Sequence, residues 1–222
     1  MNELVKKIGQ CVEFGKVNKV SPFPAEMKGL DGADEYAKEA IRSGIEPDEV
    51  LLACNDGMQR IGEKFGRNEI FIPELLMAAK AMQAVMANLK PFFKSGSVKP
   101  KGRFILGTVA GDLHDIGKNV VSMIIQGNGW EVIDLGVDVK SDRFLQKIGE
   151  NPGCVVGLSA LLTTTMANMA NTIKQIKASY SDVRIIVGGA PLTEKIAVEI
   201  GADGYACDPQ NAVVWLNSIG TI

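Results

Sequence analysis

The chain has 222 residues, of which 46% are hydrophobic and 23% are charged. This length suits one large domain or two small ones, and the composition is that of a globular protein rather than a disordered, collagen-like or coiled-coil chain. The formal net charge of −2 argues against phosphate-backbone binding as the main activity, because nucleic-acid-binding proteins usually carry a basic surplus.

Neither a membrane span nor a secretory signal is expected. No stretch approaches the roughly 20 apolar residues that cross a bilayer, and the N-terminal segment, MNELVKKIGQ, contains no apolar core. We therefore expect a cytoplasmic protein with no membrane or nucleic-acid partner. The four cysteines form no CxxC pair, which argues against zinc-ribbon and thioredoxin-type sites. We expect them to be reduced and mostly buried.

The first ninety-odd residues have the periodicity of amphipathic helices. Pro47 and the two acidic residues after it suit a first helical turn, and apolar residues then recur at steps of three and four. The same spacing follows Pro73. These patterns predict helices at 2–18, 34–43, 47–66 and from 73 to about 89, with a loop across 19–33. Residues 1–94 are therefore predicted to form a helical bundle that caps the rest of the chain.

The pattern changes after residues 95–102 (SGSVKPKG), which lack periodicity and are predicted to be a linker. Short apolar runs then alternate with helical segments, as in a parallel sheet covered on both faces. The runs predict strands at 103–110, 130–136, 154–161, 183–189 and 204–207, and the other segments predict helices at 116–127, 141–149, 164–178, 193–200 and 209–219. Residues 103–222 are thus predicted to be a doubly wound, Rossmann-like and flavodoxin-like α/β domain, in which ligands bind at the carboxyl ends of the strands.

The first predicted strand is followed by GDLHDIGKN, residues 111–119, which contains the only histidine, His114. A single histidine excludes an HExxH zinc site within one chain, and the phosphate-binding motif GxxxxGK[ST] and the dinucleotide motif GxGxxG are also absent. A metal-binding histidine normally donates its other ring N–H to a carboxylate, and Asp112 is placed to accept it. Alternatively, His114 only caps the following helix.

Small and polar residues also follow two other strands. The third predicted strand ends in Ser159 and Leu161, with a threonine run from Thr163, and the fourth ends in Gly188 and Gly189. The serine is a candidate hydrogen-bond partner for the carboxylate of the first loop. Adjacent glycines leave a slot without side chains, which suits a flat or long ligand. Each feature alone has a structural explanation as a cap or turn, but their combination at three strand ends favours a binding site.

These motifs strongly resemble the cobalamin-binding domain found in cobalamin-dependent methionine synthase. Its pattern of DxHxxG, SxL and GG is matched in order, spacing and strand-end placement by residues 112–117, residues 159–161 and the glycine pair. Residues 57–82 (GMQRIGEKFGRNEIFIPELLMAAKAM) resemble the helical cap module of methyl-transferring members. The likeness covers nearly the whole chain. It is closest to the small corrinoid proteins of methanol, methylamine, quaternary-amine and methoxyaromatic methyltransferase systems. The first forty-odd residues are less typical of that group, and the segment 19–33 has more loop character than the group leads us to expect.

The resemblance implies a bound cobalamin or related corrinoid whose own benzimidazole leaves the cobalt. His114 is then the lower axial cobalt ligand, Asp112 bonds its far ring nitrogen, and Ser159 bonds that carboxylate or the nucleotide tail. Other residues are expected to shape the loop beneath the corrin (Gly111, Asp115, Ile116 and Gly117), to line the tail slot (Leu161, Thr163, Gly188 and Gly189) or to contact the tail at the last strand (Tyr205, Cys207 and Asp208).

The helical cap is expected to shield the upper face of the cobalt. Met77 lies off the apolar stripe of its helix and is therefore a candidate to face the corrin. Alternatively, Met77, Met82 and Met86 fill the core of the bundle, since methionine suits irregular gaps. The cap must move aside for each partner, with residues 95–102 as the predicted hinge.

By this resemblance the chain is a methyl carrier and not an enzyme on its own. Cobalt(I) would take a methyl group from a substrate held by a substrate-specific methyltransferase, and methylcob(III)alamin would deliver it to a second methyltransferase that uses tetrahydrofolate or coenzyme M. A reductive activase is a further expected partner. The cofactor would do the chemistry, while the protein supplies ligation, orientation and shielding.

Three other functions compete with this interpretation. An adenosylcobalamin mutase subunit shares the B12 domain but has no use for the helical cap. A B12-dependent sensor that regulates transcription requires a DNA-binding or other output module, whereas the residues ahead of the linker are used by the cap. The last alternative is an α/β domain that binds no cofactor.

Overall fold

The structure is a computed structural model of the whole chain, and it describes residues 2–94 and 100–219. The chain divides into two compact units, one formed by residues 1–100 with 126–129 and the other by residues 101–125 with 130–222. Residues 95–99 of the predicted linker and hinge lie outside the described residues. The domain boundaries at 94 and 103 therefore stay predictions.

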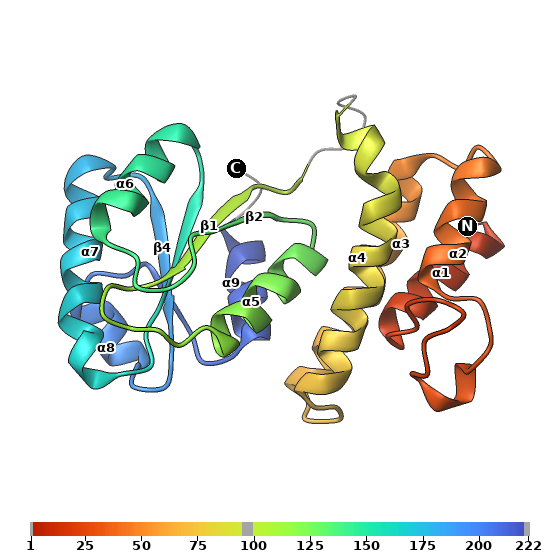
Figure 1. Cartoon of the computed structure of the whole chain (residues 1–222), viewed down its shortest axis with the longest axis horizontal. Helices are drawn as coiled ribbons and strands as arrows, with labels where there is room; N and C mark the ends of the chain where they lie inside the picture. The colour runs from red at the N-terminus through yellow and green to blue at the C-terminus, as the bar shows by residue number, and fades with distance from the viewer. Residues whose placement is uncertain (1, 95–99, 220–222) are drawn as a thin grey trace. The chain divides into compact units, whose positions relative to one another are not determined.

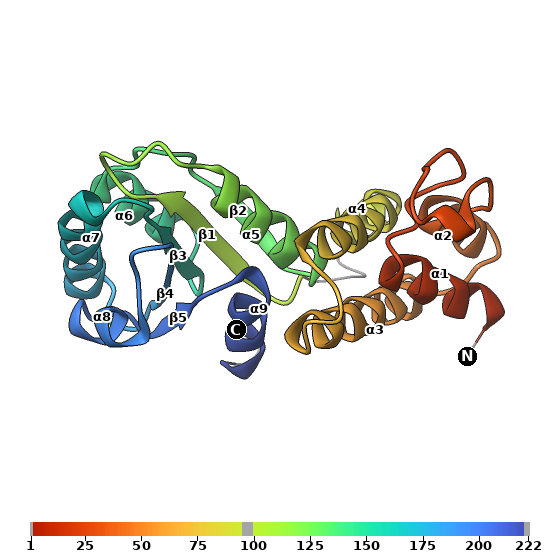
Figure 2. The ribbon, with the colours of Figure 1, turned by 90° about the horizontal axis from the view of Figure 1, so that it is seen from below.

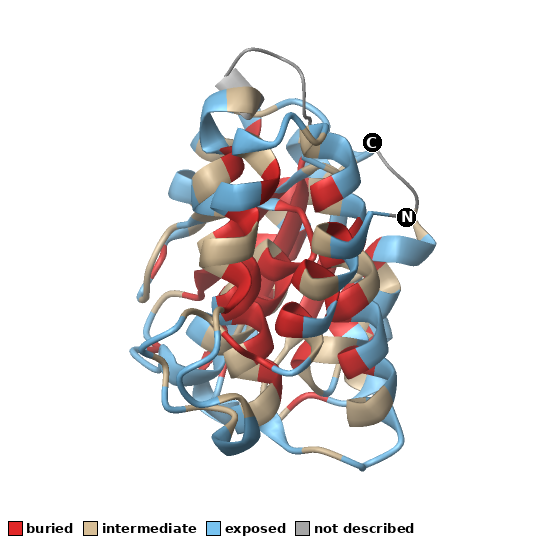
Figure 3. Ribbon diagram, turned by 90° about the vertical axis from the view of Figure 1, so that its right-hand side faces the viewer, coloured by how far each residue is buried: buried red, intermediate tan, exposed pale blue. Residues whose placement is uncertain are grey.

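The N-terminal part of the first unit is helical, as predicted. Its elements are α1 (Glu3–Glu13), the short 3₁₀ helix η1 (Ala25–Met27), α2 (Ala33–Arg42), α3 (Pro47–Gly66) and α4 (Ile72–Lys94) (Figure 1). α3 has Pro47 in its first turn, where the missing N–H costs no hydrogen bond, and acidic residues beside it that favour the helix N-terminus. Buried residues gather on the inner sides of the helices and exposed residues on the outer turns (Figure 3).

The first helix is shorter than the predicted span of 2–18. It ends at Glu13 and is followed by Gly15 with a φ of +70°, a left-handed conformation that commonly terminates helices. The predicted loop across 19–33 contains η1. None of the helices in the described ranges combines the length and the apolar character that a membrane span requires.

The second unit is a doubly wound α/β domain, as predicted, with five parallel strands in the order β2-β1-β3-β4-β5. Helices α6, α7 and α8 cover one face of the sheet, and α5 and α9 cover the other (Figures 1 and 2). The elements in chain order are β1 (Arg103–Thr108), α5 (Ile116–Gly127), β2 (Glu131–Asp134), α6 (Ser141–Glu150), β3 (Val155–Ser159), η2 (Thr163–Thr165), α7 (Met166–Ser179), β4 (Arg184–Gly188), α8 (Glu194–Glu199), β5 (Gly204–Ala206) and α9 (Pro209–Ser218).

The central strands are buried on both faces, which is why they appear in the sequence as continuous apolar runs. One core lies between the sheet and the helices α6, α7 and α8. It is formed by the residues Ile105, Val109, Val139, Phe144, Ile148, Cys154, Val156, Leu158, Ala160, Met169, Ile173, Ile176, Ile185, Val187, Leu192 and Ala197. The carboxyl ends of the strands are therefore anchored in a packed core.

The sheet register brings the three predicted motifs together. Thr108 at the end of β1 pairs with Ser159 of β3, which in turn pairs with Gly188 of β4. The strand order reverses between β1 and β3, because β1 is followed by a helix on one face and β3 by a helix on the other. Such a switch point is where ligands bind in open α/β sheets, so the fold places the candidate residues at the expected edge.

Candidate cofactor site

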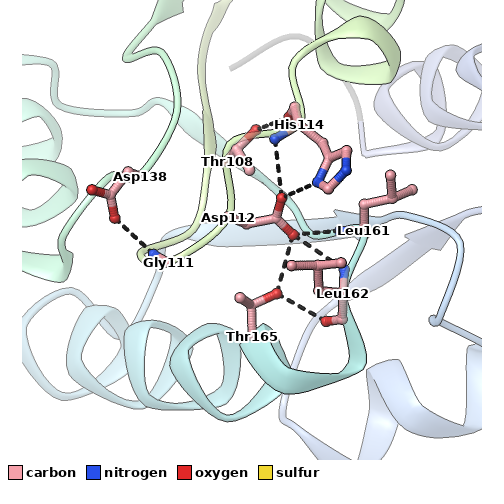
Figure 4. Close-up of polar contacts among 8 residues, drawn as sticks. All are labelled: Thr108, Gly111, Asp112, His114, Asp138, Leu161, Leu162 and Thr165. Carbon is pink, nitrogen blue, oxygen red and sulfur yellow. Dashed lines mark hydrogen bonds and ion pairs between the residues drawn. The ribbon is translucent and has the colours of Figure 1, made fainter.

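A buried carboxylate holds the only histidine of the chain in the loop between β1 and α5. Nδ1 of His114 lies 2.7 Å from Oδ1 of Asp112, and the backbone N–H of His114 donates to the same oxygen at 3.1 Å (Figure 4). The Asp112 side chain is fully buried, whereas the His114 side chain is 50% exposed. With Nδ1–H donated to the carboxylate, the neutral ring carries its lone pair on Nε2. No described residue forms a hydrogen bond with that second nitrogen.

The other oxygen of Asp112 is held by the segment that follows β3. Oδ2 accepts the backbone N–H groups of Leu161 at 2.7 Å and Leu162 at 3.2 Å (Figure 4). The hydroxyl of Thr165 lies 3.1 Å from Oδ2 and 2.9 Å from the carbonyl oxygen of Leu162, which share its single hydrogen. Every lone pair of the buried carboxylate therefore faces a donor, which is the condition for burying a charge without a large free-energy penalty.

The pKa of Asp112 follows from these contacts. Burial by itself raises the pKa of a carboxyl group, but the N–H groups of Leu161 and His114, the imidazole and the N–H of Leu162 together hold the pKa of Asp112 well below its ordinary value. The group is therefore ionised at neutral pH. A fixed negative charge at Nδ1 makes Nε2 a stronger electron donor.

The hydroxyl group that contacts the Asp112 carboxylate is not the one that the sequence predicts. The described residues place Thr165, and not Ser159, in hydrogen-bond contact with the carboxylate. Ser159 lies within the sheet, where its carbonyl oxygen accepts the N–H of Val109. Thr165 is brought back towards the carboxylate by the 3₁₀ helix η2. The predicted bond from Ser159 to Asp112 is therefore wrong, and a role of Ser159 at the nucleotide tail stays a prediction.

Replacing Thr165 by valine is expected to destabilise the chain by about 1–2 kcal/mol, because valine keeps the shape but removes a hydrogen bond to a charged group. Ser159→Ala is the matched control and is expected to change stability by less than about 0.5 kcal/mol. The stability changes of both variants are measured as the free energy of unfolding in urea. Equal losses in the two variants would contradict the assignment of the hydroxyl to Thr165.

The loop beneath His114 contains the other predicted residues of its motif. Gly111 has a φ of +83°, which glycine adopts without strain. Asp115 is exposed and accepts from the side chain of Asn119 at 3.1 Å. Ile116, which begins α5, is 80% exposed, and a Cβ on Gly117 would meet nothing within 4 Å. These residues leave open, partly apolar surface beside the imidazole.

The glycine pair after β4 lies against the end of β3. A Cβ on Gly188 would lie 3.1 Å from the carbonyl oxygen of Ala206, and one on Gly189 would lie 1.7 Å from that of Ala160. Only a residue without a side chain fits this second position. Leu161 and Thr163 are exposed beside it. The structure thus brings together the residues predicted to line the tail slot.

The remaining predicted residues have contacts of their own. The hydroxyl of Tyr205 donates to the carbonyl oxygen of Leu192 at 3.1 Å. The carboxylate of Asp208 caps α9 by accepting the N–H of Asn211, and the thiol of Cys207 lies 3.6 Å from its other oxygen. A contact of these residues with the tail stays a prediction.

Met77 is half-buried on α4 and packs within the helical unit. A Cβ on Gly15 would lie 2.6 Å from the Cβ of Met77, whereas Met82 is fully buried in the core. That Met77 faces the corrin stays a prediction.

Several residues that position the histidine loop are absent from the sequence-based prediction. The hydroxyl of Thr108 donates to the carbonyl oxygen of His114 at 2.9 Å, and Asp138 accepts the N–H of Gly111 at 2.7 Å (Figure 4). Asn168 of α7 donates to the carbonyl oxygen of Ala110 at 2.8 Å. These residues carry no local motif, because their role depends on strands and helices that are distant in sequence.

Comparison with known proteins identifies the ligand class. Two family models, each described as a B12 binding domain, match residues 102–214 and residues 30–90. The chain is 39% identical over 186 residues to the trimethylamine corrinoid protein of Methanosarcina barkeri, and the aligned region covers 82% of this chain and 86% of that protein. It is also 39% identical over 180 residues to dimethylamine corrinoid protein 3 of Methanosarcina acetivorans, with coverage of 80% and 84%. The chain belongs to the corrinoid methyl-carrier proteins of methylamine and methanol methyltransferase systems.

Solved structures of corrinoid proteins have the same fold. The methanol:cobalamin methyltransferase complex MtaBC from Methanosarcina barkeri contains a similar chain with a TM-score of 0.80 and 25% identity, covering 98% of this chain and 80% of that one. A cobalamin-binding protein from Desulfitobacterium hafniense DCB-2 gives a TM-score of 0.75 and 29% identity, covering 96% and 97%. The predicted family, fold and cobalamin or corrinoid binding are therefore confirmed, and the alternative without a cofactor is excluded.

The residues at the carboxyl edge of the sheet fit a corrinoid. A corrinoid protein that ligates cobalt through histidine needs one ring nitrogen fixed and the other available, and His114 meets both conditions. Leu113 and Ile116, which flank the imidazole, are 71% and 80% exposed and offer apolar surface to a macrocycle. A Cβ at Gly189 would collide with the carbonyl oxygen of Ala160, so glycine at this position lets the turn after β4 pack directly against the end of β3.

Proposed function

We propose that this corrinoid protein carries a methyl group from a substrate-specific methyltransferase to a second methyltransferase, with tetrahydrofolate or coenzyme M as acceptor. When bound, the corrinoid supplies the cobalt atom that holds the methyl group. The protein contributes ligation, orientation and exclusion of water, and is not an enzyme on its own. The membership of the corrinoid protein family supports the carrier role.

The single observation that carries the site assignment is the contact between Nδ1 of His114 and the buried carboxylate of Asp112. This contact fixes the ring orientation and the tautomer, and leaves the lone pair of Nε2 available to bind a metal. We therefore propose His114 as the lower axial ligand of the cobalt and Asp112, with Thr165, as its support. A lone histidine that merely capped α5 would not require a fully buried carboxylate with five donors.

The nucleotide tail is proposed to lie in the slot beside Gly188 and Gly189. The lack of side chains at two adjacent positions of this strand end supports the assignment, since a ligand can approach glycine backbone closely. Ser159, Leu161 and Thr163 would contact the tail from β3 and the segment that follows it.

The partner is proposed to be a methyltransferase of the kind found in the methanol:cobalamin methyltransferase complex, whose structure contains the similar chain. The methyl donor would be bound by that partner, and a reductive activase would be a third partner. The helical unit is proposed to shield the upper face of the corrin, because the family model for residues 30–90 is itself a B12 binding domain.

The ligand assignment is tested by electron paramagnetic resonance of the cob(II)alamin form with ¹⁵N-histidine in the protein. If Nε2 of His114 is the axial donor, the three-line nitrogen splitting becomes a two-line splitting on labelling. His114→Ala is expected to lose this label-dependent splitting. A three-line pattern that the label does not change would show that benzimidazole stays on the cobalt and would overturn the role of His114.

The carrier role is distinguished from that of a mutase subunit by cofactor form. A methyl carrier is expected to accept methyl groups onto its corrinoid from an added methyltransferase and to turn over without adenosylcobalamin. Selective binding of adenosylcobalamin, together with failure to accept methyl groups from any methylamine or methanol methyltransferase, would favour the mutase reading.

A further inference from the structure

The segment that follows β2 runs beside the histidine loop and is hydrogen-bonded to it. The N–H of Thr108 donates to the carbonyl oxygen of Gly136 at 3.0 Å, and the N–H of Val139 donates to that of Thr108 at 2.9 Å. Val109 and Val139 form an isolated parallel bridge. The pairing of β1 with β2 thus continues past the ends of both strands.

Asp138 in this segment binds the histidine loop at two points. Its carboxylate oxygen Oδ1 accepts the N–H of Gly111 at 2.7 Å (Figure 4), and its own N–H donates to the carbonyl oxygen of Asp112 at 3.0 Å. The residue is exposed, so burial does not force it into this place. The two bonds hold the backbone on both sides of the Asp112 side chain.

The backbone of Asp138 is in the left-handed region, with a φ of +52°. Residues other than glycine are uncommon in this conformation, although aspartate and asparagine tolerate it better than most, and a non-glycine residue persists there where surrounding contacts hold it. The conformation is what lets the side chain and the N–H of Asp138 point at the same loop. A cost in backbone strain is thus tied to the contacts with Gly111 and Asp112.

We infer that Asp138 is a positioning residue that sets the orientation of His114 through the backbone of Gly111 and Asp112. Thr108 holds the far end of the loop at the carbonyl oxygen of His114, and Asp138 holds the near end together with Asn168, which donates to the carbonyl oxygen of Ala110. A shift of this backbone would move the carboxylate relative to both Nδ1 and the N–H groups after β3, which now lie 2.7–3.2 Å from it. The link from His114 to cobalt rests on the proposed function, but the positioning of the imidazole does not.

Three substitutions separate the possible contributions of Asp138. Asp138→Asn keeps an acceptor oxygen and tolerates a positive φ, but removes the charge. Asp138→Gly removes the acceptor and all strain, and Asp138→Ala removes the acceptor while keeping the strain. Asp142→Ala, at an exposed aspartate in the first turn of α6, is the matched control.

The first measurement is the ¹⁵N resonances of the His114 ring in the corrinoid-free chain at fixed pH. Because His114 is the only histidine, its ring signals need no assignment. Asp138→Asn and Asp142→Ala are expected to match the wild type, whereas Asp138→Gly and Asp138→Ala shift both ring nitrogens. Wild-type signals in Asp138→Gly, or shifted signals in Asp138→Asn, would overturn the inference. If Asp138→Ala fails to fold, the glycine variant decides.

The second measurement is the fraction of cob(II)alamin with histidine ligation. Asp138→Gly is expected to lower the equilibrium constant for histidine ligation by about tenfold, the lower end of losses at residues that orient a metal-ligating histidine, and Asp138→Asn to leave it unchanged. If His114→Ala removes the ligation but Asp138→Gly does not alter it, the positioning role of Asp138 is overturned while the cobalt ligation by His114 stands. If His114→Ala has no effect, the proposed cobalt ligation fails, and the ring resonances still test Asp138.

Discussion

Replacing Asp112 by alanine is expected to destabilise the corrinoid-free chain by about 3–5 kcal/mol, because the backbone N–H groups of Leu161 and Leu162 and the ring of His114 lose the carboxylate together. The N–H groups of Leu161 and Leu162 and the hydroxyl of Thr165 all point at Oδ2. Because the carboxylate is fully buried, its removal leaves these donors facing the space that it occupied. The same change should abolish histidine ligation, since His114 loses the partner that orients it.

The loss is measured by urea unfolding followed by tryptophan fluorescence. Both tryptophans, Trp130 and Trp215, belong to the α/β unit, so the signal reports on the unit that contains Asp112. Asp112→Asn keeps one acceptor oxygen and is expected to lose less than the alanine variant. Asp142→Ala is again the surface control. A loss below about 1 kcal/mol for Asp112→Ala would show that the carboxylate network contributes little to folding.

The stability difference between the wild type and Asp112→Ala is expected to depend on pH, and the direction follows from the pKa of Asp112. The pKa of Asp112 in the folded chain is below its ordinary value of 3.8, so the unfolded chain binds the proton first as the pH falls. The stabilisation by the carboxylate is therefore complete above about pH 5 and is lost as the pH falls from about 4 towards the folded-state pKa. The stability gap between wild type and Asp112→Ala should be constant between about pH 5 and 7 and shrink below about pH 4.

The fold was predictable because its elements have strong local signals. α3 (Pro47–Gly66) matches the predicted span at both ends, since a proline marks its start and the apolar period continues through its length. Each predicted strand agrees with the observed one to within two residues at either end, because buried parallel strands are apolar throughout. The first helix was predicted too long, although Gly15 is the residue type that ends helices.

Sequence patterns predicted the site only for those side chains that lie close to the end of their own strand. Asp112 and His114 are two residues apart, so their contact is local and follows from the motif. The choice between Ser159 and Thr165 depends instead on how η2 bends the chain after β3. Asp138 reaches the loop through the parallel pairing of β1 and β2. Such contacts are set by register between strands, and no spacing along the sequence encodes them.

Replacing Gly189 by alanine is expected to destabilise the α/β unit by about 3–5 kcal/mol, through overpacking of about 1–3 kcal/mol and backbone strain of similar size. A Cβ here would lie 1.7 Å from the carbonyl oxygen of Ala160, and the φ of +141° is almost confined to glycine. The obstacle is backbone, so no side-chain rotation relieves it. Either the turn after β4 or the end of β3 must move.

Movement at the end of β3 would also reach the histidine. Ala160 precedes Leu161, whose N–H donates to Asp112 at 2.7 Å, so Gly189→Ala should reduce histidine ligation even though residue 189 does not contact His114. The control is Gly66→Ala at the end of α3, where a Cβ would meet nothing within 4 Å and helix propensity favours alanine by roughly 0.5–1 kcal/mol. Urea unfolding and the ¹⁵N signals of the His114 ring measure the two effects. Loss of stability with unchanged ring signals would mean that the turn after β4 moves instead, and that a shift at Gly189 does not reach the histidine.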